Sequence, residues 1–169
     1  MWTHRLLKVR RENRAIYSQR LITLVLWQEE VARVFLLTGS IAVKLRVVVA
    51  DDNPECLSQL LATLSPQFEV IATATDGGSA LNSIRELRPD VAIVDLKMPN
   101  LNGIELTKKA TCCPPQAAVV ICSVESDPEI IEHALNAGAL GYVLKSQIAS
   151  DLIPAVNSAA AGRRFVSRT

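Results

Sequence analysis

The sequence predicts an α/β fold, a doubly wound five-stranded parallel sheet with helices on both faces. Short apolar runs rich in β-branched residues recur from about residue 45 along the 169-residue chain. These runs lack an alternation of polar and apolar residues, which is typical of strands buried on both faces. Segments with the apolar spacing of amphipathic helices separate them. This alternation favours right-handed crossovers, which place helices on both faces of a parallel sheet.

The expected strands are short and mostly apolar. They cover residues 45–50, 69–74, 91–95, 118–123 and 142–144. Between them, apolar residues recur with the spacing that gives a helix one apolar face. These stripes are Leu57, Leu60, Leu61 and Leu64; Ala80, Ile84 and Leu87; Ile131, Ala134 and Leu135; and Leu152, Val156 and Ala159. A weaker pattern predicts a further helix over 103–110.

Proline and glycine residues mark the expected helix ends. Asp127 followed by Pro128 predicts the start of one helix, and Gly138 predicts its end. Pro154 lacks a backbone N–H, so we expect it in the first turn of the last helix. That helix would then begin near Asp151.

A basic and apolar segment precedes this pattern. Residues 1–44 carry a net charge of +5, whereas the remaining residues carry −4. The apolar stretches 21–27 and 31–37 are shorter than the ~18–20 residues of a membrane span. The predicted organisation is an N-terminal extension over 1–43, helical or disordered, followed by one domain over 44–169. Alternatives for the extension are a basic amphipathic helix on a membrane or a partner, and an upstream extension of the reading frame.

The composition excludes several classes of function. Aromatic residues make up 4% of the chain, which argues against a stacking platform for single-stranded nucleic acid. A net charge of +1 excludes a uniformly basic nucleic-acid binder. The four cysteines form no C-x-x-C pair and the chain has two histidines, so a zinc site is not expected. Reduced thiols favour a cytoplasmic protein.

Polar residues follow several of the expected strands. Asp51 and Asp52 come after the first strand, and Asp95 ends the third. Ser123 ends the fourth strand, and Lys145 follows the fifth. In an open parallel sheet, ligands bind beyond the carboxyl ends of the strands, where the strand order reverses. Each residue alone is more often a turn or cap residue, but their shared place at one sheet edge predicts a site.

Three carboxylates in one place need a cation. Two carboxylates about 4 Å apart repel by roughly 4 kcal/mol at an effective dielectric constant near 20. Mg²⁺ suits oxygen ligands and keeps several waters, which leaves room for a phosphoryl oxygen. A lysine supplies a positive charge, and a serine a hydrogen bond, to a phosphate. A carboxylate beside Mg²⁺ can act as a nucleophile and form an aspartyl-phosphate.

Four strings of residues resemble the receiver domain of bacterial two-component response regulators. They are VVVADDNP, VAIVDLKMPNLNGIEL, VVICS and AGALGYVLKS. The resemblance covers about residues 44–168 and implies a flavodoxin-like fold with strand order 2-1-3-4-5. The tail that ends in GRRFVS is similar to the receivers that precede a LuxR-type helix-turn-helix.

The resemblance implies a Mg²⁺-dependent phosphorylation site. By this resemblance, Asp95 is the phospho-acceptor and Lys145 pairs with the phosphate. Asp51 and Asp52 are the acidic pair that holds Mg²⁺, with Asp52 the more direct ligand. Asp95 and the main-chain carbonyl of Lys97 are further metal ligands.

The resemblance also implies a conformational switch, with Ser123 as its hydroxyl group and Tyr142 as its aromatic residue. Val124 stands where the family usually has a small residue or a methionine, so we expect it to restrict inward movement of Tyr142. In the family, residues 97 and 125 border the path of the water that hydrolyses the phosphate. Lys97 and Glu125 stand there, and their opposite charges predict an ion pair and slow dephosphorylation.

We therefore expect a phospho-accepting signalling switch and not a turnover enzyme. The expected donor is a sensor histidine kinase, and the expected dimer surface is the fourth helix, fifth strand and fifth helix of the domain. Because the chain stops at Thr169, no DNA contact is expected, and the chain is either a shortened transcriptional regulator or a stand-alone receiver. A degenerate receiver that only binds proteins is an alternative. A phosphohydrolase of the aspartyl-phosphate type is disfavoured because Lys97 replaces its second acid.

Overall fold

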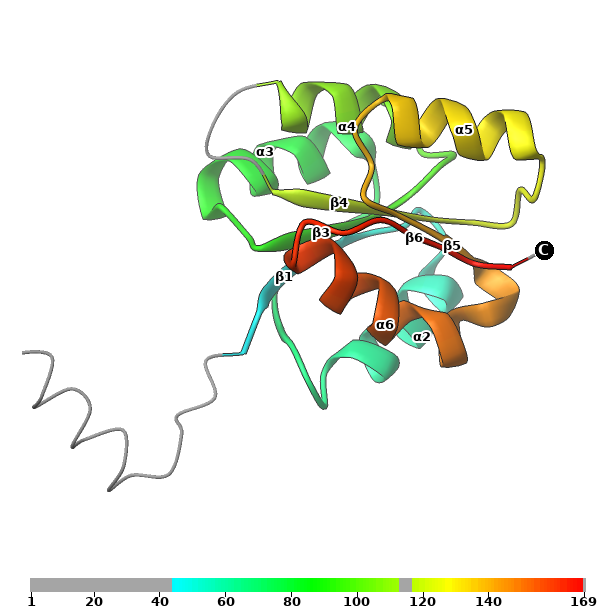
Figure 1. Ribbon diagram of the computed structural model, residues 1–169. Helices are drawn as coiled ribbons and strands as arrows, with labels where there is room; N and C mark the ends of the chain where they lie inside the picture. The colour runs from blue at the N-terminus through cyan, green and yellow to red at the C-terminus, as the bar shows by residue number, and fades with distance from the viewer. Residues whose placement is uncertain (1–43, 113–116, 169) are drawn as a thin grey trace, which may run out of the picture. The chain divides into compact units, whose positions relative to one another are not determined.

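The computed structural model describes residues 44–112 and 117–168 of the chain. These residues belong to the second of two units, Lys44–Thr169. The predictions made for residues 1–43 lie outside the described residues and stay predictions. Within the described unit, a parallel sheet lies between two layers of helices (Figure 1).

The sheet contains six strands within the described residues. They are β1 (Arg46–Ala50), β2 (Glu69–Ala74), β3 (Val91–Asp95), β4 (Ala118–Ser123), β5 (Gly141–Leu144) and β6 (Phe165–Val166). Their order is β2-β1-β3-β4-β5-β6, and each pair is parallel. The predicted order 2-1-3-4-5 is confirmed, and β6 is added at the β5 edge. Strands β3 and β5 are buried along their whole length, as their continuous apolar runs predict.

Helices cover both faces of the sheet, as predicted. They are α2 (Pro54–Leu64), α3 (Gly77–Leu87), α4 (Gly103–Thr111), α5 (Pro128–Asn136) and α6 (Ile148–Ala160). Helices α3, α4 and α5 lie on one face, and α2 and α6 on the other (Figure 1). Each layer closes its own apolar core against the sheet. Among the described residues, no helix is both long and apolar enough to cross a membrane.

Short polar side chains start four of these helices. The side chain of each cap residue accepts hydrogen bonds from backbone N–H groups of the first turn, which have no partner within the helix. The cap residues are Asn53, Asp76, Asn102 and Asp127. The predicted start of α5 at Asp127 and Pro128 is confirmed, and Gly138 follows its end with a φ of 108°. Glycine adopts this left-handed conformation without the clash that a Cβ would cause.

Helix α6 begins earlier than Pro154 predicted. The helix starts at Ile148, directly after a 3₁₀ turn over Lys145–Gln147, so Pro154 lies inside the helix and not in its first turn. Ile148, Leu152 and Val156 recur at a spacing of four residues and are all buried. The free energy gained by burying these apolar side chains exceeds the cost of the backbone hydrogen bond that Pro154 cannot donate.

The chain returns along the sheet after α6 and forms β6. Phe165 N donates to Leu140 O at 2.9 Å, and Ser167 N donates to Tyr142 O at 2.9 Å. The Ser167 side chain is 4% exposed, accepts a hydrogen bond from Leu144 N and donates one to Asp151 Oδ2 at 2.6 Å. A two-residue strand has no periodicity, so the sequence pattern did not predict it.

Candidate functional site

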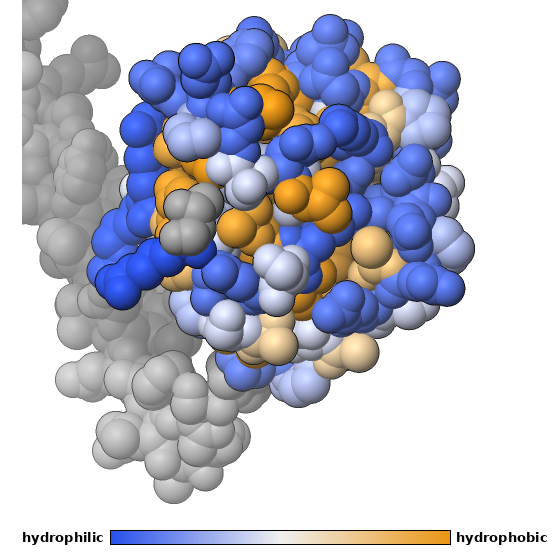
Figure 2. Space-filling view, turned by 90° about the vertical axis from the view of Figure 1, so that its right-hand side faces the viewer, coloured by the Kyte–Doolittle hydropathy of each residue, from blue (hydrophilic) through white to orange (hydrophobic). Residues whose placement is uncertain are grey.

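The register of the sheet brings the predicted site residues to one edge. Asp95 at the end of β3 pairs with Cys122 of β4, so Ser123 extends one residue beyond it. Ser123 in turn pairs with Leu144 of β5, and Lys145 follows. The carboxyl ends of the parallel strands meet at this edge, which Figure 2 views face on. Its surface is mainly hydrophilic, with hydrophobic residues between the hydrophilic ones.

Asp51 is the most deeply buried acid of the site, with no exposed surface. Its backbone N–H donates to Ala74 O, which ties the end of β1 to β2. Its Oδ1 accepts a hydrogen bond from Asn53 N at 2.9 Å, and Asn53 in turn caps α2. The other oxygen, Oδ2, faces the Lys145 ammonium at 2.7 Å. The turn into α2 thus holds Asp51 with one carboxylate oxygen toward the sheet edge.

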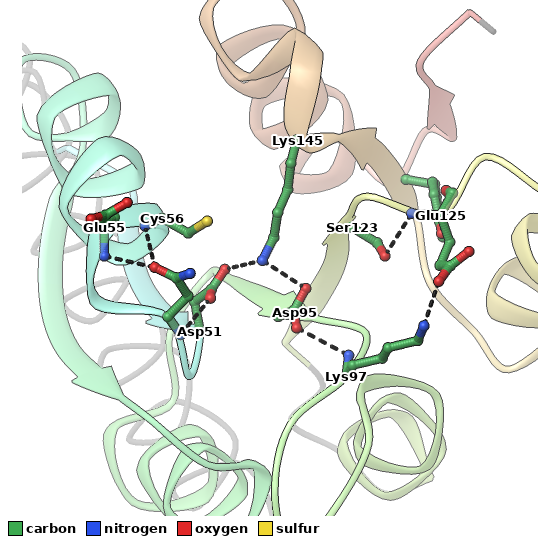
Figure 3. A network of polar contacts seen from close by, with 10 residues as sticks. Asp51, Glu55, Cys56, Asp95, Lys97, Ser123, Glu125 and Lys145 are labelled. Atoms are coloured by element: carbon green, nitrogen blue, oxygen red, sulfur yellow. Dashed lines mark hydrogen bonds and ion pairs between the residues drawn. The ribbon is translucent and has the colours of Figure 1, made fainter.

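Asp95 is 6% exposed and lies at the centre of the site (Figure 3). Its Oδ2 accepts a hydrogen bond from Lys97 N at 3.0 Å, and its Oδ1 lies 3.0 Å from the Lys145 ammonium. Burial raises the pKa of Asp95 above its ordinary value, although Lys145 opposes this rise. A buried carboxylate with few hydrogen-bond partners keeps its lone pairs available for a bond to another atom.

Lys145 bridges two carboxylates. Its side chain is 13% exposed and extends from the end of β5 to both Asp51 and Asp95 (Figure 3). Burial lowers the pKa of Lys145, but its hydrogen bonds and charge attraction to the two acids outweigh this, so its pKa is raised. The lysine therefore stays charged at neutral pH and offsets part of the negative charge of the site.

Three carboxylates converge at this place. Oxygen atoms of Asp51, Asp52 and Asp95 all lie within 4.8 Å of one another, and Asp52 is exposed to solvent. With Lys145 as the cation beside them, the cluster carries a formal charge of −2 when all three acids are ionised. Hard oxygen donors with an exposed member suit Mg²⁺, which keeps several waters. The residues present therefore fit the predicted metal.

The predicted switch residues are both buried. Ser123 is 2% exposed, and its Oγ accepts a hydrogen bond from Glu125 N at 3.2 Å. Tyr142 has no exposed surface, and its hydroxyl donates to Glu125 O at 2.9 Å. The prediction that Val124 restricts inward movement of Tyr142 is wrong, because Tyr142 is already inside and Val124 is 71% exposed.

The predicted ion pair between Lys97 and Glu125 is present. It joins the segment after β3 to the segment after β4, beside Asp95 (Figure 3). The Lys97 side chain is 72% exposed and that of Glu125 is 30% exposed. The hydrogen bond from Lys97 to Glu125 raises the pKa of the lysine.

Sequence reasoning missed two contributions to the site. The main-chain carbonyl of Glu125 holds the Tyr142 hydroxyl, and no side-chain pattern indicates a main-chain acceptor. Gly103 starts α4 so close to β3 that an added Cβ would lie 2.4 Å from Asp95 O. A glycine shortly after Asp95 is the sequence signal that was available for this contact.

Comparison with known proteins identifies one family. The model of the response regulator receiver domain matches residues 47–157. The transcriptional regulatory protein DegU of Brevibacillus brevis is 35% identical over 73% of this chain and 53% of its own length. The probable transcriptional regulatory protein NarL of Mycobacterium tuberculosis is 35% identical over 73% of this chain and 58% of its own length. The chain thus spans little more than half of these relatives.

Solved structures agree with this relationship. The signal receiver domain of NarL from Mycobacterium tuberculosis has a TM-score of 0.68 and 34% identity, over 71% of this chain and 98% of that structure. The REC domain of RcsB from Salmonella enterica, solved with the phosphomimetic BeF₃⁻, has a TM-score of 0.67 and 26% identity. That match covers 74% of this chain and 94% of the RcsB structure.

Proposed function

The chain belongs to the response regulator receiver family, and we propose that Asp95 is its phosphorylation site. The observation that carries this proposal is the position of the Lys145 ammonium between Asp95 and Asp51, with Asp52 beside them. Such a cluster combines a nucleophilic carboxylate, a cation for a phosphoryl group and oxygen donors for a metal. The presence of all three favours an active receiver over a degenerate one that only binds proteins.

The proposed reaction transfers a phosphoryl group from a phosphohistidine of a sensor histidine kinase to Asp95. A carboxylate oxygen of Asp95 forms the new P–O bond while the P–N bond breaks, and the electron pair stays on the imidazole nitrogen. The Lys145 ammonium, 3.0 Å from Asp95 Oδ1, then attracts the charge that arrives with the phosphoryl group. The product is a phosphorylated switch, so we propose a signalling protein and not a turnover enzyme.

Mg²⁺ is the proposed cofactor, with Asp51, Asp52, Asp95 and the main-chain carbonyl of Lys97 as its ligands. When bound, the ion would neutralise phosphoryl oxygens and orient the group for transfer. The chain itself preorganises the site, because the hydrogen bonds from Asn53 N to Asp51 and from Lys97 N to Asp95 fix two of the carboxylates.

We further propose that phosphorylation is read through Ser123 and Tyr142, onto the surface formed by α5, β5 and α6. This surface is the fourth helix, fifth strand and fifth helix of the domain, and it is the proposed place of homodimer contact. Support comes from the buried Tyr142 hydroxyl on Glu125 O, because a change at Ser123 would move the same segment. The relatives named as transcriptional regulators suggest that this receiver serves a cytoplasmic transcriptional regulator.

The test is phosphorylation of the purified protein with acetyl phosphate, followed by intact-mass measurement. We expect the wild type to gain one phosphoryl group when Mg²⁺ is present and none when a chelator is added. Asp95→Asn should gain none. Asp127→Asn is the matched control, because asparagine also caps a helix, and it should react like the wild type. A phosphoryl group that still attaches to Asp95→Asn would overturn the assignment.

A further inference from the structure

The loop between β3 and α4, residues 96–102, carries the main-chain carbonyl of Lys97 and is held at both ends. Lys97 N donates to Asp95 Oδ2 at the start of the loop, and Gly103 N donates to Leu96 O at 2.9 Å where the loop ends. Asn100 near its middle has a φ of 67°, the left-handed conformation that few residues other than glycine and asparagine adopt. We call residues 96–102 the β3–α4 loop.

The middle of the β3–α4 loop lies directly against the first turn of α3. Gly77 N donates to Pro99 O at 3.1 Å. A Cβ added at Gly77 would lie 1.9 Å from Leu101 O and 2.8 Å from Leu101 C. Both of these atoms belong to the backbone, so the loop itself would have to move to admit a side chain. The loop therefore occupies its position only because residue 77 has no Cβ.

A second contact joins the same two segments. Asn100 Nδ2 donates to Asp76 Oδ1 at 3.2 Å, while Asp76 also caps α3 through Gly78 N and Ser79 N. The Ser79 hydroxyl is the largest cause that lowers the pKa of Asp76 to about 2, and Asn100 adds to it. Asp76 thus stays ionised and acts as an acceptor for the loop as well as for the helix.

We propose that Asp76 and Gly77 are positioning residues, which hold the β3–α4 loop so that the Lys97 carbonyl can bind Mg²⁺. This inference rests on the proposed function, because it assigns a role toward the metal of that site. Mg²⁺ requires near-ideal octahedral geometry, so a shift of one ligand weakens its binding. Residues that orient metal ligands from outside the ligand set have large effects on metal affinity.

The experiment measures the Kd of Mg²⁺ from the shifts of backbone amide NMR signals of the full chain as MgCl₂ is added. We expect Gly77→Ala to raise this Kd about tenfold or more. Asn82→Ala is the control in the same helix, because the Asn82 side chain is exposed to solvent and lies outside the contacts of Asp76 and Gly77 with the loop. We expect it to change the Kd less than about twofold.

A milder variant covers the case in which Gly77→Ala does not fold. Asn100→Gly keeps a residue that accepts the left-handed backbone and removes only the amide, and we expect it to raise the Kd about two- to tenfold. The double variant Asn100→Gly with Asp76→Ser should lose less free energy of Mg²⁺ binding than the two single variants lose together. The reason is that both substitutions remove the same contact. Serine retains the helix cap, so urea unfolding without Mg²⁺ should change little.

The outcomes separate the two proposals. If Asn100→Gly binds Mg²⁺ as tightly as the wild type, the role of Asp76 is overturned, and if a folded Gly77→Ala does so, the role of Gly77 is overturned. In both cases the proposed function stands. Additive effects of Asn100→Gly and Asp76→Ser would also overturn the role of Asp76, because they would show independent contributions. If the wild type fails to bind Mg²⁺ at all, the proposed metal site itself is wrong and the positioning role falls with it.

Discussion

Lys145 is the residue on which the charge balance of the site depends. Its ammonium lies within 3.0 Å of two acids that are almost entirely buried. We expect Lys145→Met to lower the free energy of unfolding at pH 7 by about 3–5 kcal/mol, because two buried carboxylates would then face each other without a cation. Urea unfolding without Mg²⁺ measures this loss, and added Mg²⁺ should reduce it.

The exposed Lys109 of α4 provides the control for this prediction. Lys109→Met removes the same charge from a solvated helix surface and should change stability by less than about 0.5 kcal/mol. Equal stability of the two variants would contradict the role assigned to Lys145. Adding Asp51→Asn to Lys145→Met should recover part of the loss, because it removes one of the two opposed charges.

The ion pair of Lys97 and Glu125 leads to a prediction about the lifetime of the phosphate. The pair is exposed enough that it contributes only about 0–1 kcal/mol to stability. Its two long side chains lie beside Asp95, where they would hinder a water that approaches the phosphorus atom. We expect Lys97→Asn to speed loss of phosphate after acetyl phosphate is removed, as measured by intact mass over time. Decay that is unchanged or slower than in the wild type would show that the pair does not shield the site.

The last strand and the last helix depend on each other through Ser167. Ser167→Ala removes the donor to Asp151 and leaves the buried Leu144 N without its acceptor. We expect a loss of about 1–3 kcal/mol in the free energy of unfolding. Ser150→Ala is the control, because its hydroxyl also donates to Asp151 but is exposed, and it should cost less than about 0.5 kcal/mol.

The same contact predicts a pH dependence. The Ser167 hydroxyl, followed by that of Ser150, lowers the pKa of Asp151 below its ordinary value of 3.8. A carboxyl group whose pKa is lowered in the folded state adds stability above its unfolded pKa, and this stability is lost as the pH falls through the folded pKa. The difference in stability between wild type and Ser167→Ala should therefore be full at pH 6 and shrink below about pH 4. A difference that grows on acidification would contradict this assignment.

Helix α6 contains a proline that costs it a hydrogen bond. Pro154 is exposed and lies at the seventh position of the helix, where its nitrogen cannot donate to Ser150 O. We expect the restored hydrogen bond in Pro154→Ala to raise the free energy of unfolding by about 1–3 kcal/mol. The greater freedom of the unfolded chain without proline should reduce this gain by about 0.4–1 kcal/mol. Pro128→Ala is the control at the first position of α5, where no donor is needed, and it should give no gain. A gain of equal size in both variants would contradict this explanation.

At the scale of the whole molecule, we expect a chain shortened to begin near Val43 to fold and to accept phosphate. Within the described residues, the buried apolar side chains run from Val47 to Ala159 and form both core layers. Both tryptophans, Trp2 and Trp27, would be removed, so unfolding should be followed by circular dichroism. Cooperative unfolding with an unchanged midpoint is the expected result. Loss of both the transition and phosphorylation would show that residues 1–43 complete the core.

The features that the sequence predicted depend on local pattern, and those it missed depend on distant contacts. Buried parallel strands have continuous apolar runs, so the order of β1 to β5 and the edge that carries Asp95 followed from the pattern together with the family resemblance. The predicted start of α6 was wrong because Pro154 was assigned to the first turn of the helix, whereas the burial of Ile148 places the start six residues before this proline. The contact of Gly77 with Leu101 was missed because the two residues are distant in the sequence and only the folded chain brings them together.

The short strand β6 also decides where the C-terminal residues of the domain lie. Helix α6 carries the backbone from the carboxyl edge of the sheet to the opposite edge, and β6 carries it back beside β5 (Figure 1). Arg168, whose carbonyl accepts a hydrogen bond from Gln147, is therefore close to the turn that contains Lys145. A pull on the residues that follow β6 would therefore act on its pairing with β5, the strand that carries Tyr142 and leads into Lys145.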